Sequence, residues 1–264
     1  MVFTTDHSPS VIRTYEWRSV ANSCAYVLPY LRTSMKVLDV GCGPGSITMD
    51  LAKKVPEGHV TGIDYVDEPL KIARLRAAQQ GITNIDFHTG DIYRLDFPAS
   101  TFDLVHAHQV LQHIADPVRA LKEMRRVVKP GGIVAVRESA SCVWYPESQG
   151  IHDYHKLSAC VSKDKGGHPH PGSHIHLWAR DAGFELRNIR RTTGSWCFST
   201  PEEREYWGGS IAERVVSSGF AKILVEEGYC TADDLHELEQ AWRHFINEEV
   251  AWYSMLHGEM VCVK

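Results

Sequence analysis

The sequence lacks the features that would assign it to a membrane, a secretory route or a metal site. No apolar run approaches the roughly 20 residues that a membrane-spanning helix needs, and residues 1–10 contain no basic segment followed by a hydrophobic one. The 7 cysteines are odd in number, scattered and never spaced C-x-x-C, which disfavours a disulfide framework and a zinc site. We expect a soluble, cytoplasmic protein that has no resident metal.

A surplus of positive charge is also absent. The 28 Lys and Arg residues are outnumbered by 33 Asp and Glu residues, so the net charge is −5 and there is no electrostatic footprint for nucleic acid. The chain contains no internal repeat, low-complexity tract or flexible linker, and its 264 residues fit one large domain. We therefore expect a single domain that binds neither nucleic acid nor a membrane.

The most informative stretch is a glycine turn at residues 37–46, VLDVGCGPGS. A short apolar strand runs into Gly41, Gly43 and Gly45, which can take positive φ and carry no Cβ, so a ligand can lie against bare backbone. The turn departs from the dinucleotide pattern G-x-G-x-x-G because Ser46 stands at the third glycine, and no Lys-Ser/Thr pair follows as in a Walker loop. The pattern predicts a nucleotide-type cradle.

Short apolar strands alternate with helical spacing through the first half of the chain. The strands are expected at 35–40, 59–63, 84–88, 102–106 and 133–136. This order predicts right-handed βαβ units and a parallel sheet covered on both faces, with ligands beyond the carboxyl ends of the strands. The polar residues at or just past those ends are Asp64, Asp91, His108 and Glu138.

The second half is less regular, and residues 139–172 are rich in Ser, His, Trp, Tyr and Gly. Helices are expected over 151–161, from a Ser173 cap to Ala182, and after caps at Thr200 and Thr231. Further strands are expected over 184–192 and 258–264.

With these elements in place, the first half resembles the class I S-adenosylmethionine-dependent methyltransferases, in particular their UbiE-like small-molecule branch. The matching motifs are VLDVGCGPG (37–45), GIDY (62–65), HTGDIYRLDF (88–97), FDLVHAHQVLQHIADP (102–117) and RVVKPGGIVAVRE (126–138). Their order and spacing are more specific than any one of them.

The resemblance implies an α/β fold, a Rossmann-like seven-stranded, mostly parallel sheet with helices on both faces and helical lid insertions. The seventh strand would be antiparallel, between strands five and six. The single methyltransferase domain would comprise an N-terminal cap (1–34), a cofactor-binding core (35–138), cap loops and helices (139–183), strand six (184–198), a helical lid (199–257) and a final strand (258–264).

The implied cofactor is S-adenosyl-L-methionine. Asp64 can accept hydrogen bonds from both ribose hydroxyls. Asp91 could accept one from the adenine amine and Asp39 could meet the ammonium group, although both could instead cap turns. The predicted cofactor-binding residues are Tyr15, Asp39, Gly41, Gly43, Gly45, Asp64, Tyr65, Asp91, Ile92 and His108.

Methyl transfer needs a general base only when the acceptor must lose a proton, and histidine suits that role at neutral pH. His108 and His113 follow strand four on the cofactor side, and we favour His108 because His113 could pack or cap. A plain polar contact from His108 to the acceptor or the cofactor tail is an equally open alternative.

A small-molecule acceptor is the implied partner, and the chain is expected to be a monomer or homodimer. The histidines between 152 and 176 could suggest a metal, but no Cys or carboxylate follows them at ligand spacing. We expect some of them to line an acceptor cavity together with aromatic residues. The candidate acceptor-binding residues are Trp17, Gln109, Glu138, Trp144, Tyr145, His170 and His174.

Three other functions stay open. The same fold could use bound S-adenosylmethionine structurally while catalysing a cyclisation or rearrangement. A nicotinamide-dependent oxidoreductase is disfavoured by Ser46. A non-enzymatic regulator is argued against by the histidines that follow strand four.

Overall fold

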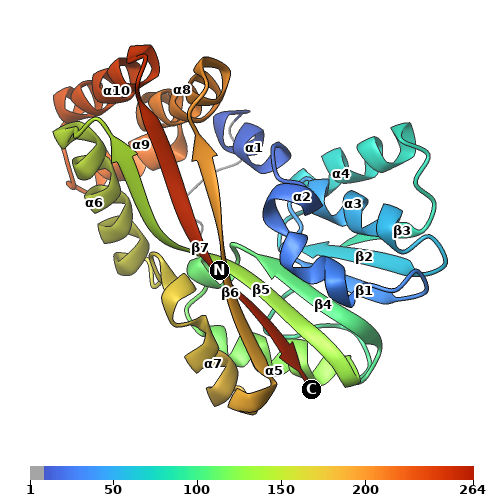
Figure 1. Ribbon diagram of the computed structural model, residues 1–264. Coiled ribbons are helices and arrows are strands. Elements are labelled where there is room, and N and C mark those ends of the chain that lie inside the picture. The colour runs from blue at the N-terminus through green and yellow to red at the C-terminus, as the bar shows by residue number, and fades with distance from the viewer. Residues whose placement is uncertain (1–8) are drawn as a thin grey trace.

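Seven strands form one mixed sheet, in the order β3-β2-β1-β4-β5-β7-β6, in the computed structural model, which describes residues 9–264 (Figure 1). The strands are β1 (Lys36–Val40), β2 (His59–Asp64), β3 (Ile85–Thr89), β4 (Phe102–His108), β5 (Val128–Tyr145), β6 (Ile189–Phe198) and β7 (Trp252–Val263). Strands β1 to β5 pair in parallel, and β7 is antiparallel to both β5 and β6. This confirms the predicted sheet; residues 1–8 of the predicted N-terminal cap lie outside the described part.

Helices cover both faces of the sheet because side chains alternate along the buried strands. On β1, Val37 packs in one cluster with Leu51, whereas Leu38 packs in another with Leu121. The helices are α1 (Pro9–Glu16), α2 (Val20–Ser23), α3 (Ser46–Lys54), α4 (Asp67–Gln79), α5 (Pro117–Val127), α6 (Gln149–Asp164), α7 (Ile175–Asp181), α8 (Pro201–Ser217), α9 (Gly219–Glu226) and α10 (Ala232–Asn247).

Three strands differ in extent from the sequence prediction. Strand β5 continues past 136 to Tyr145, β7 begins at Trp252 rather than at 258, and β6 runs over 189–198 rather than 184–192. The added residues pair with one another, as in the register Tyr145↔Trp252. Residues 139–145 have the alternating exposure of a strand, which their Ser- and Trp-rich composition did not reveal.

The helix starts follow local side-chain chemistry in most cases. Asp116 accepts a hydrogen bond from the Arg119 N–H, and Thr200 and Thr231 each open a capping box, as predicted. The predicted Ser173 cap is wrong, because Ser173 lies in a 3-10 turn (Pro171–Ser173) and His174 precedes α7.

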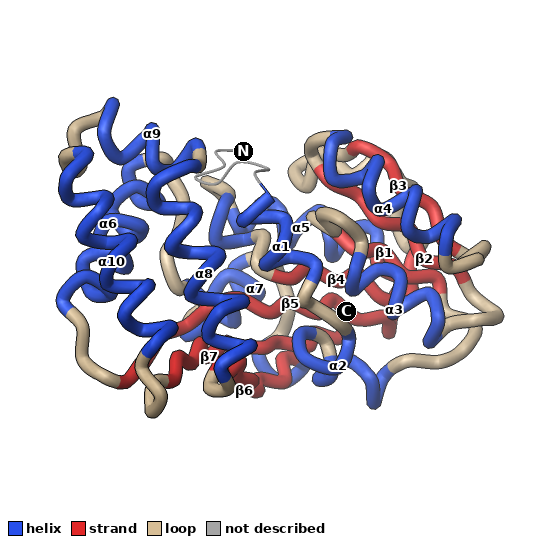
Figure 2. The backbone as a smooth tube through the Cα atoms, turned by 90° about the horizontal axis from the view of Figure 1, so that it is seen from above, coloured by secondary structure: helices blue, strands red, loops and turns tan. Residues whose placement is uncertain are grey.

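Helices α6, α8, α9 and α10 gather at one end of the long strands β5, β6 and β7 (Figures 1 and 2). Figure 2 shows α1 between this group and the half that contains α3 and α4. The helical group has its own core, which includes Trp196, Trp207, Trp242 and Tyr253. Within residues 9–264, no helix has the length and apolar character required to cross a bilayer.

Candidate active site

The glycine turn lies at the point where the strand order reverses, since β1 has β2 on one side and β4 on the other. The turn is fixed by the Gly41 and Cys42 N–H groups, which donate to the Ile63 carbonyl at 2.8 and 3.0 Å. Gly41, Gly43 and Gly45 have φ of 69°, 54° and 77°, as their sequence position predicted.

The three glycines have different neighbours. A Cβ on Gly45 would lie 2.9 Å from the Ala73 Cβ, so this glycine permits close packing of α3 against α4. A Cβ on Gly43 would have no protein atom within 4 Å. Gly41 and Gly43 line the cavity above the turn, whereas Gly45 does not, and its cofactor contact stays a prediction.

This first cavity lies beyond the carboxyl ends of β1, β2 and β4. It contains most of the predicted cofactor residues, namely Tyr15, Asp39, Gly41, Gly43, Asp64, Tyr65, Ile92 and His108. The remaining lining residues are Arg18, Val40, Cys42, Pro44, Ser46, Ile47, Ile63, Pro69, Gly90, Gln109, Val110 and His113.

Asp64 ends β2 at the wall of this cavity. Its Oδ2 accepts a hydrogen bond from the Gly43 N–H at 2.9 Å, and its Oδ1 accepts one from Val66 at 3.4 Å. The carboxylate is thus held beside the turn and faces the same cavity as Gly43.

Asp39 is held inside the sheet by two side chains. The parallel register places it opposite His106, whose Nδ1 lies 2.7 Å from Asp39 Oδ1. Thr48 donates to the other oxygen at 2.6 Å. Burial opposes charging of His106, but the neighbouring Cys24 and Asp39 raise its pKa to about 10. Asp39 therefore serves first as a buried ion-pair partner, and the predicted contact with a ligand ammonium would add to these bonds.

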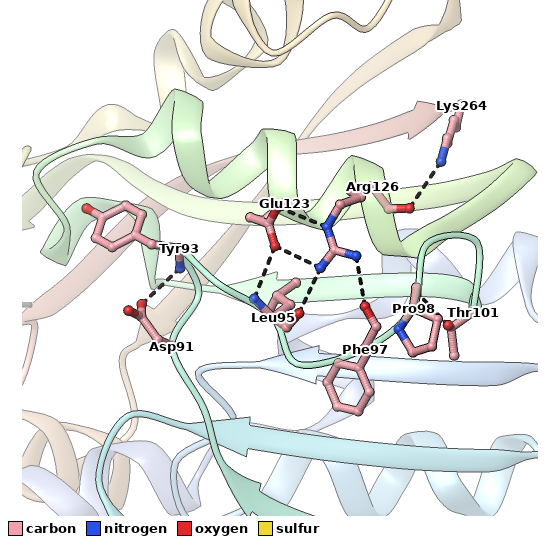
Figure 3. Close-up of polar contacts among 9 residues, drawn as sticks. All are labelled: Asp91, Tyr93, Leu95, Phe97, Pro98, Thr101, Glu123, Arg126 and Lys264. Atoms are coloured by element: carbon pink, nitrogen blue, oxygen red, sulfur yellow. Dashed lines mark hydrogen bonds and ion pairs between the residues drawn. The ribbon is translucent and has the colours of Figure 1, made fainter.

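Asp91 does not line the first cavity, although both of its neighbours do, and its adenine contact stays a prediction. Its Oδ1 accepts a hydrogen bond from the Tyr93 N–H at 2.9 Å, which makes it a turn cap (Figure 3). The flanking residues Gly90 and Ile92 line the cavity instead.

The segment that follows Asp91 is anchored from α5. Arg126 donates to the carbonyls of Leu95 and Phe97 at 2.7 and 2.8 Å, and Glu123 accepts from the Leu95 N–H at 3.1 Å (Figure 3). The hydrogen bond and charge of Arg126 hold the pKa of Glu123 below its usual value. This network fixes the loop that carries Ile92 to the cavity.

His108 reaches the first cavity from the end of β4. Both of its ring nitrogens are buried without a hydrogen-bond partner among the described residues. Burial, together with Arg18 and Arg137, lowers its pKa well below the usual value, so the ring is neutral at pH 7. Such an imidazole offers one donor and one acceptor to a bound molecule.

Glu138 lines neither this cavity nor the second one described below, and its acceptor contact stays a prediction. Its fully buried carboxylate accepts backbone hydrogen bonds from Val110, Leu111 and Gln112 at 2.9, 2.7 and 3.4 Å. Burial raises its pKa to about 7 despite these bonds. Glu138 therefore holds the turn after β4, which presents Gln109 and His113 to the cavities.

A second cavity adjoins the first beneath the helical group. The two share Tyr15, Arg18, Gln109 and His113. The other lining residues come from α1, β5, α6, the 167–171 segment, α8, α9 and β7: Thr14, Gln112, Ser139, Cys142, Tyr154, His155, Ser158, Ala159, Ser162, His168, Pro169, His170, Trp207, Ile211, Arg214, Phe220, Tyr253 and Met255.

Of the predicted acceptor-binding residues, Gln109 and His170 line this cavity. Trp17 does not, because its ring packs edge-on against Trp196 at 5.1 Å. Trp144 does not either, since it stacks on His155 at 5.0 Å.

The other two predicted acceptor residues, Tyr145 and His174, also lie outside this cavity. Tyr145 lies at the end of β5 and is 52% exposed. His174 precedes α7, where its ring meets Trp178 at 5.0 Å. Within residues 9–264, no three His, Cys, Asp or Glu side chains gather as metal ligands.

Arg18 and Arg214 had no sequence signal, and His155 was expected only as one of the histidines between 152 and 176. Arg18 follows Trp17 directly, yet only the fold shows that its guanidinium joins the two cavities. His155 and Arg214 lie on helices without a motif and reach the second cavity through packing. Beside the shared wall, the fully buried His257 receives a hydrogen bond from the Gln109 amide at 3.1 Å.

Residues 31–193 match the family of methyltransferase domains. An uncharacterized methyltransferase of Schizosaccharomyces pombe is 34% identical to 96% of this chain, which covers 93% of that protein. A probable methyltransferase of Aspergillus luteorubrus, ltbC, is 32% identical to 98% of this chain, which covers 95% of it.

The fold also resembles solved structures. Phosphoethanolamine N-methyltransferase 2 of Haemonchus contortus, solved with phosphomonomethylethanolamine and S-adenosylhomocysteine, aligns with a TM-score of 0.60 at 18% identity. The alignment covers 100% of this chain and 61% of that one.

Proposed function

The chain belongs to the family of methyltransferase domains, as its sequence motifs predicted, and we propose that it methylates a small-molecule acceptor bound in the second cavity. The cofactor is S-adenosylmethionine. One observation carries the assignment of the acceptor site: the two cavities share a wall of four side chains, Tyr15, Arg18, Gln109 and His113. An acceptor in the second cavity is thereby placed next to the first.

The residues of the first cavity fit this cofactor. Asp64 supplies carboxylate oxygens where a ribose would need acceptors. The backbone at Gly43 is open, with no protein atom within 4 Å of an added Cβ. Ile92 and Tyr65 offer apolar surface for a flat ring. Both ring nitrogens of His108 are buried without a hydrogen-bond partner among the described residues and can bind polar groups of the cofactor.

The bound cofactor supplies an electrophilic methyl group, so the work of this chain is placement and exclusion of water. The electron pair of the acceptor atom forms the new bond, and any proton on that atom must leave. The sequence favoured His108 as the base, but His108 lines only the first cavity, whereas His113 lines both, and we assign the role to His113 for that reason. Burial and Arg18 lower the pKa of His113 to about 4, so its ring is neutral at pH 7. The Gln112 amide donates to His113 Nε2 at 3.1 Å, and this hydrogen bond must open before that nitrogen can take a proton.

Cofactor binding tests the assignment of Asp64. We expect Asp64→Ala to weaken S-adenosylmethionine binding about 100-fold in calorimetric titration, because hydrogen bonds to a charged group contribute about 1.5–3 kcal/mol each. Asp86→Ala is the matched control, since Asp86 pairs with His59 outside the cavity, and it should bind the cofactor like the unmodified chain. Equal affinity in all three proteins would refute the ribose contact.

Isotope transfer tests the reaction itself. Incubation with methyl-labelled cofactor and candidate acceptors should move the label into product. Conversion of an acceptor with the label retained on the cofactor would instead support a cyclisation or rearrangement. The nicotinamide alternative loses its basis, because the family is one of methyltransferases.

A further inference from the structure

The second cavity contains cationic side chains but no carboxylate. Arg18 and Arg214 both line it, and none of its lining residues, all drawn from 9–264, is Asp or Glu. A cation that is removed from water requires a counter-charge or a full set of hydrogen-bond acceptors. The two guanidinium groups must therefore be judged by the partners that they have.

Arg18 has neutral partners. Its Nη2 donates to the Gln109 amide oxygen at 2.6 Å, and its Cζ lies 4.6 Å from the centre of the Tyr15 ring. Its Nε is buried without a hydrogen-bond partner in the described part of the chain. Burial lowers the pKa of Arg18 to about 10, so the group is still cationic at neutral pH.

Arg214 on α8 likewise has a neutral hydrogen-bond partner and one buried nitrogen without a partner among the described residues. Its Nη2 donates to the Thr14 hydroxyl at 3.2 Å, and its Nε is buried without a partner among residues 9–264. The neighbouring Glu213 instead pairs with Arg13 at 3.3 Å. Glu213 is thus adjacent to Arg214 in sequence, but it pairs with Arg13 and does not line the cavity.

The histidines of the cavity add donors and acceptors rather than charge. Burial lowers the pKa of His113 and of His155 to about 4, and it also lowers the pKa of His170. His168 Nε2 and His170 Nδ1 are buried without partners within the described chain. At neutral pH the positive charge of the lining therefore resides on Arg18 and Arg214.

The remaining surface suits a flat ring. Four aromatic side chains from three helices and one strand line the cavity: Tyr154, Trp207, Phe220 and Tyr253. The Trp207 and Tyr253 rings lie nearly parallel, 6.0 Å apart with an interplanar angle of 29°. Aromatic walls of this kind favour a planar aromatic guest.

We propose that the acceptor is an aromatic carboxylate, whose anionic group is held by Arg18 and Arg214 and whose ring packs against the aromatic walls. The inference rests on the proposed function and names the substrate class of its second cavity. Guanidinium groups match the geometry of a carboxylate, and a carboxylate would satisfy the donors that now lack partners.

Binding of matched probes to the protein saturated with S-adenosylhomocysteine tests the inference. The probes are 2-naphthoate and its uncharged isostere 2-naphthamide, and calorimetry gives both dissociation constants. We expect the carboxylate to bind at least about tenfold more tightly than the amide, as for charge-assisted against neutral hydrogen bonds. Equal affinities, or no binding of either probe at millimolar concentration, would overturn the inference.

Variants test whether the preference for the carboxylate arises in the second cavity. Arg214→Gln should abolish the preference for the carboxylate and leave S-adenosylhomocysteine affinity unchanged, because Arg214 lines only the second cavity. Arg214→Lys should retain the preference, which guards against a folding defect. Arg13→Gln is the control for a paired arginine. A preference that survives in Arg214→Gln contradicts the inference, whereas failure of the unmodified protein to bind S-adenosylhomocysteine contradicts the proposed function.

Discussion

The two cavities are built in different ways. The first is lined chiefly by short turns at the ends of neighbouring strands, and backbone atoms at Gly41 and Gly43 form part of its wall. The second is lined by side chains from α1, α6, α8, α9 and two long strands, brought together only by packing. The comparison teaches that the lining of the first cavity is encoded locally in this chain, whereas the lining of the proposed acceptor cavity depends on the assembly of distant helices.

The largest effect is expected from the buried ion pair beneath the first cavity. Asp39→Asn removes the charge that His106 faces inside the sheet, and breaking a buried pair costs about 3–5 kcal/mol. The free energy of unfolding, measured by denaturant titration, should fall by that order. Thr48→Val, which removes one hydrogen bond to the same carboxylate, should cost less, about 1.5–3 kcal/mol.

The same pair predicts a pH dependence. The folded-state pKa of His106 is raised to about 10, above its unfolded value of about 6.5. The stability that this contributes is full below pH 6.5 and is lost as the pH rises through 10. Asp39→Asn should flatten this decline, and an unchanged slope between pH 6.5 and 10 would contradict the assignment.

A smaller effect, shared by both cavities, is expected from Glu138. Glu138→Ala leaves three backbone N–H groups without their acceptor, which costs about 2–3 kcal/mol, and it loosens the turn that carries Gln109 and His113. Affinity for cofactor and for acceptor should both fall in calorimetry. Glu138→Gln keeps one acceptor oxygen and should lose less. A change in one affinity alone would show that the turn does not serve both cavities.

The smallest effect is expected at a predicted acceptor residue that lies outside both cavities. Tyr145→Ala should change the free energy of unfolding by less than about 0.5 kcal/mol and leave the acceptor KM unchanged, since the side chain is exposed outside both cavities. His170→Ala, which alters the lining, should raise that KM. A rise for Tyr145→Ala would restore its predicted role.

The residues of the first cavity could be predicted from the sequence more completely than those of the second cavity. Gly43 and Asp64 were identified because a tight strand-to-helix turn and the end of the next strand have strong local signatures. Asp39 was found by the same pattern, but its bond to His106 depends on the register between β1 and β4.

Other predicted residues lie outside both cavities because similar local patterns serve different purposes. Asp91 follows β3 and Glu138 lies within β5, yet one caps a turn and the other binds backbone N–H groups. In the second half, Trp17 and Trp144 were expected at the acceptor site for their residue type, but large aromatic rings also stabilise a core, and that is where both lie. Arg18 and Arg214 were missed because nothing local distinguishes a cavity arginine from a surface one.

The central claim is that cofactor and acceptor occupy separate cavities that share one wall. A crystal structure with S-adenosylhomocysteine and 2-naphthoate tests it most directly. The account predicts the nucleoside beside Asp64 and Gly43, the carboxylate beside Arg214, and the two ligands adjacent across Tyr15, Arg18, Gln109 and His113. Electron density for S-adenosylhomocysteine in the second cavity, or for the carboxylate away from both arginines, would contradict it.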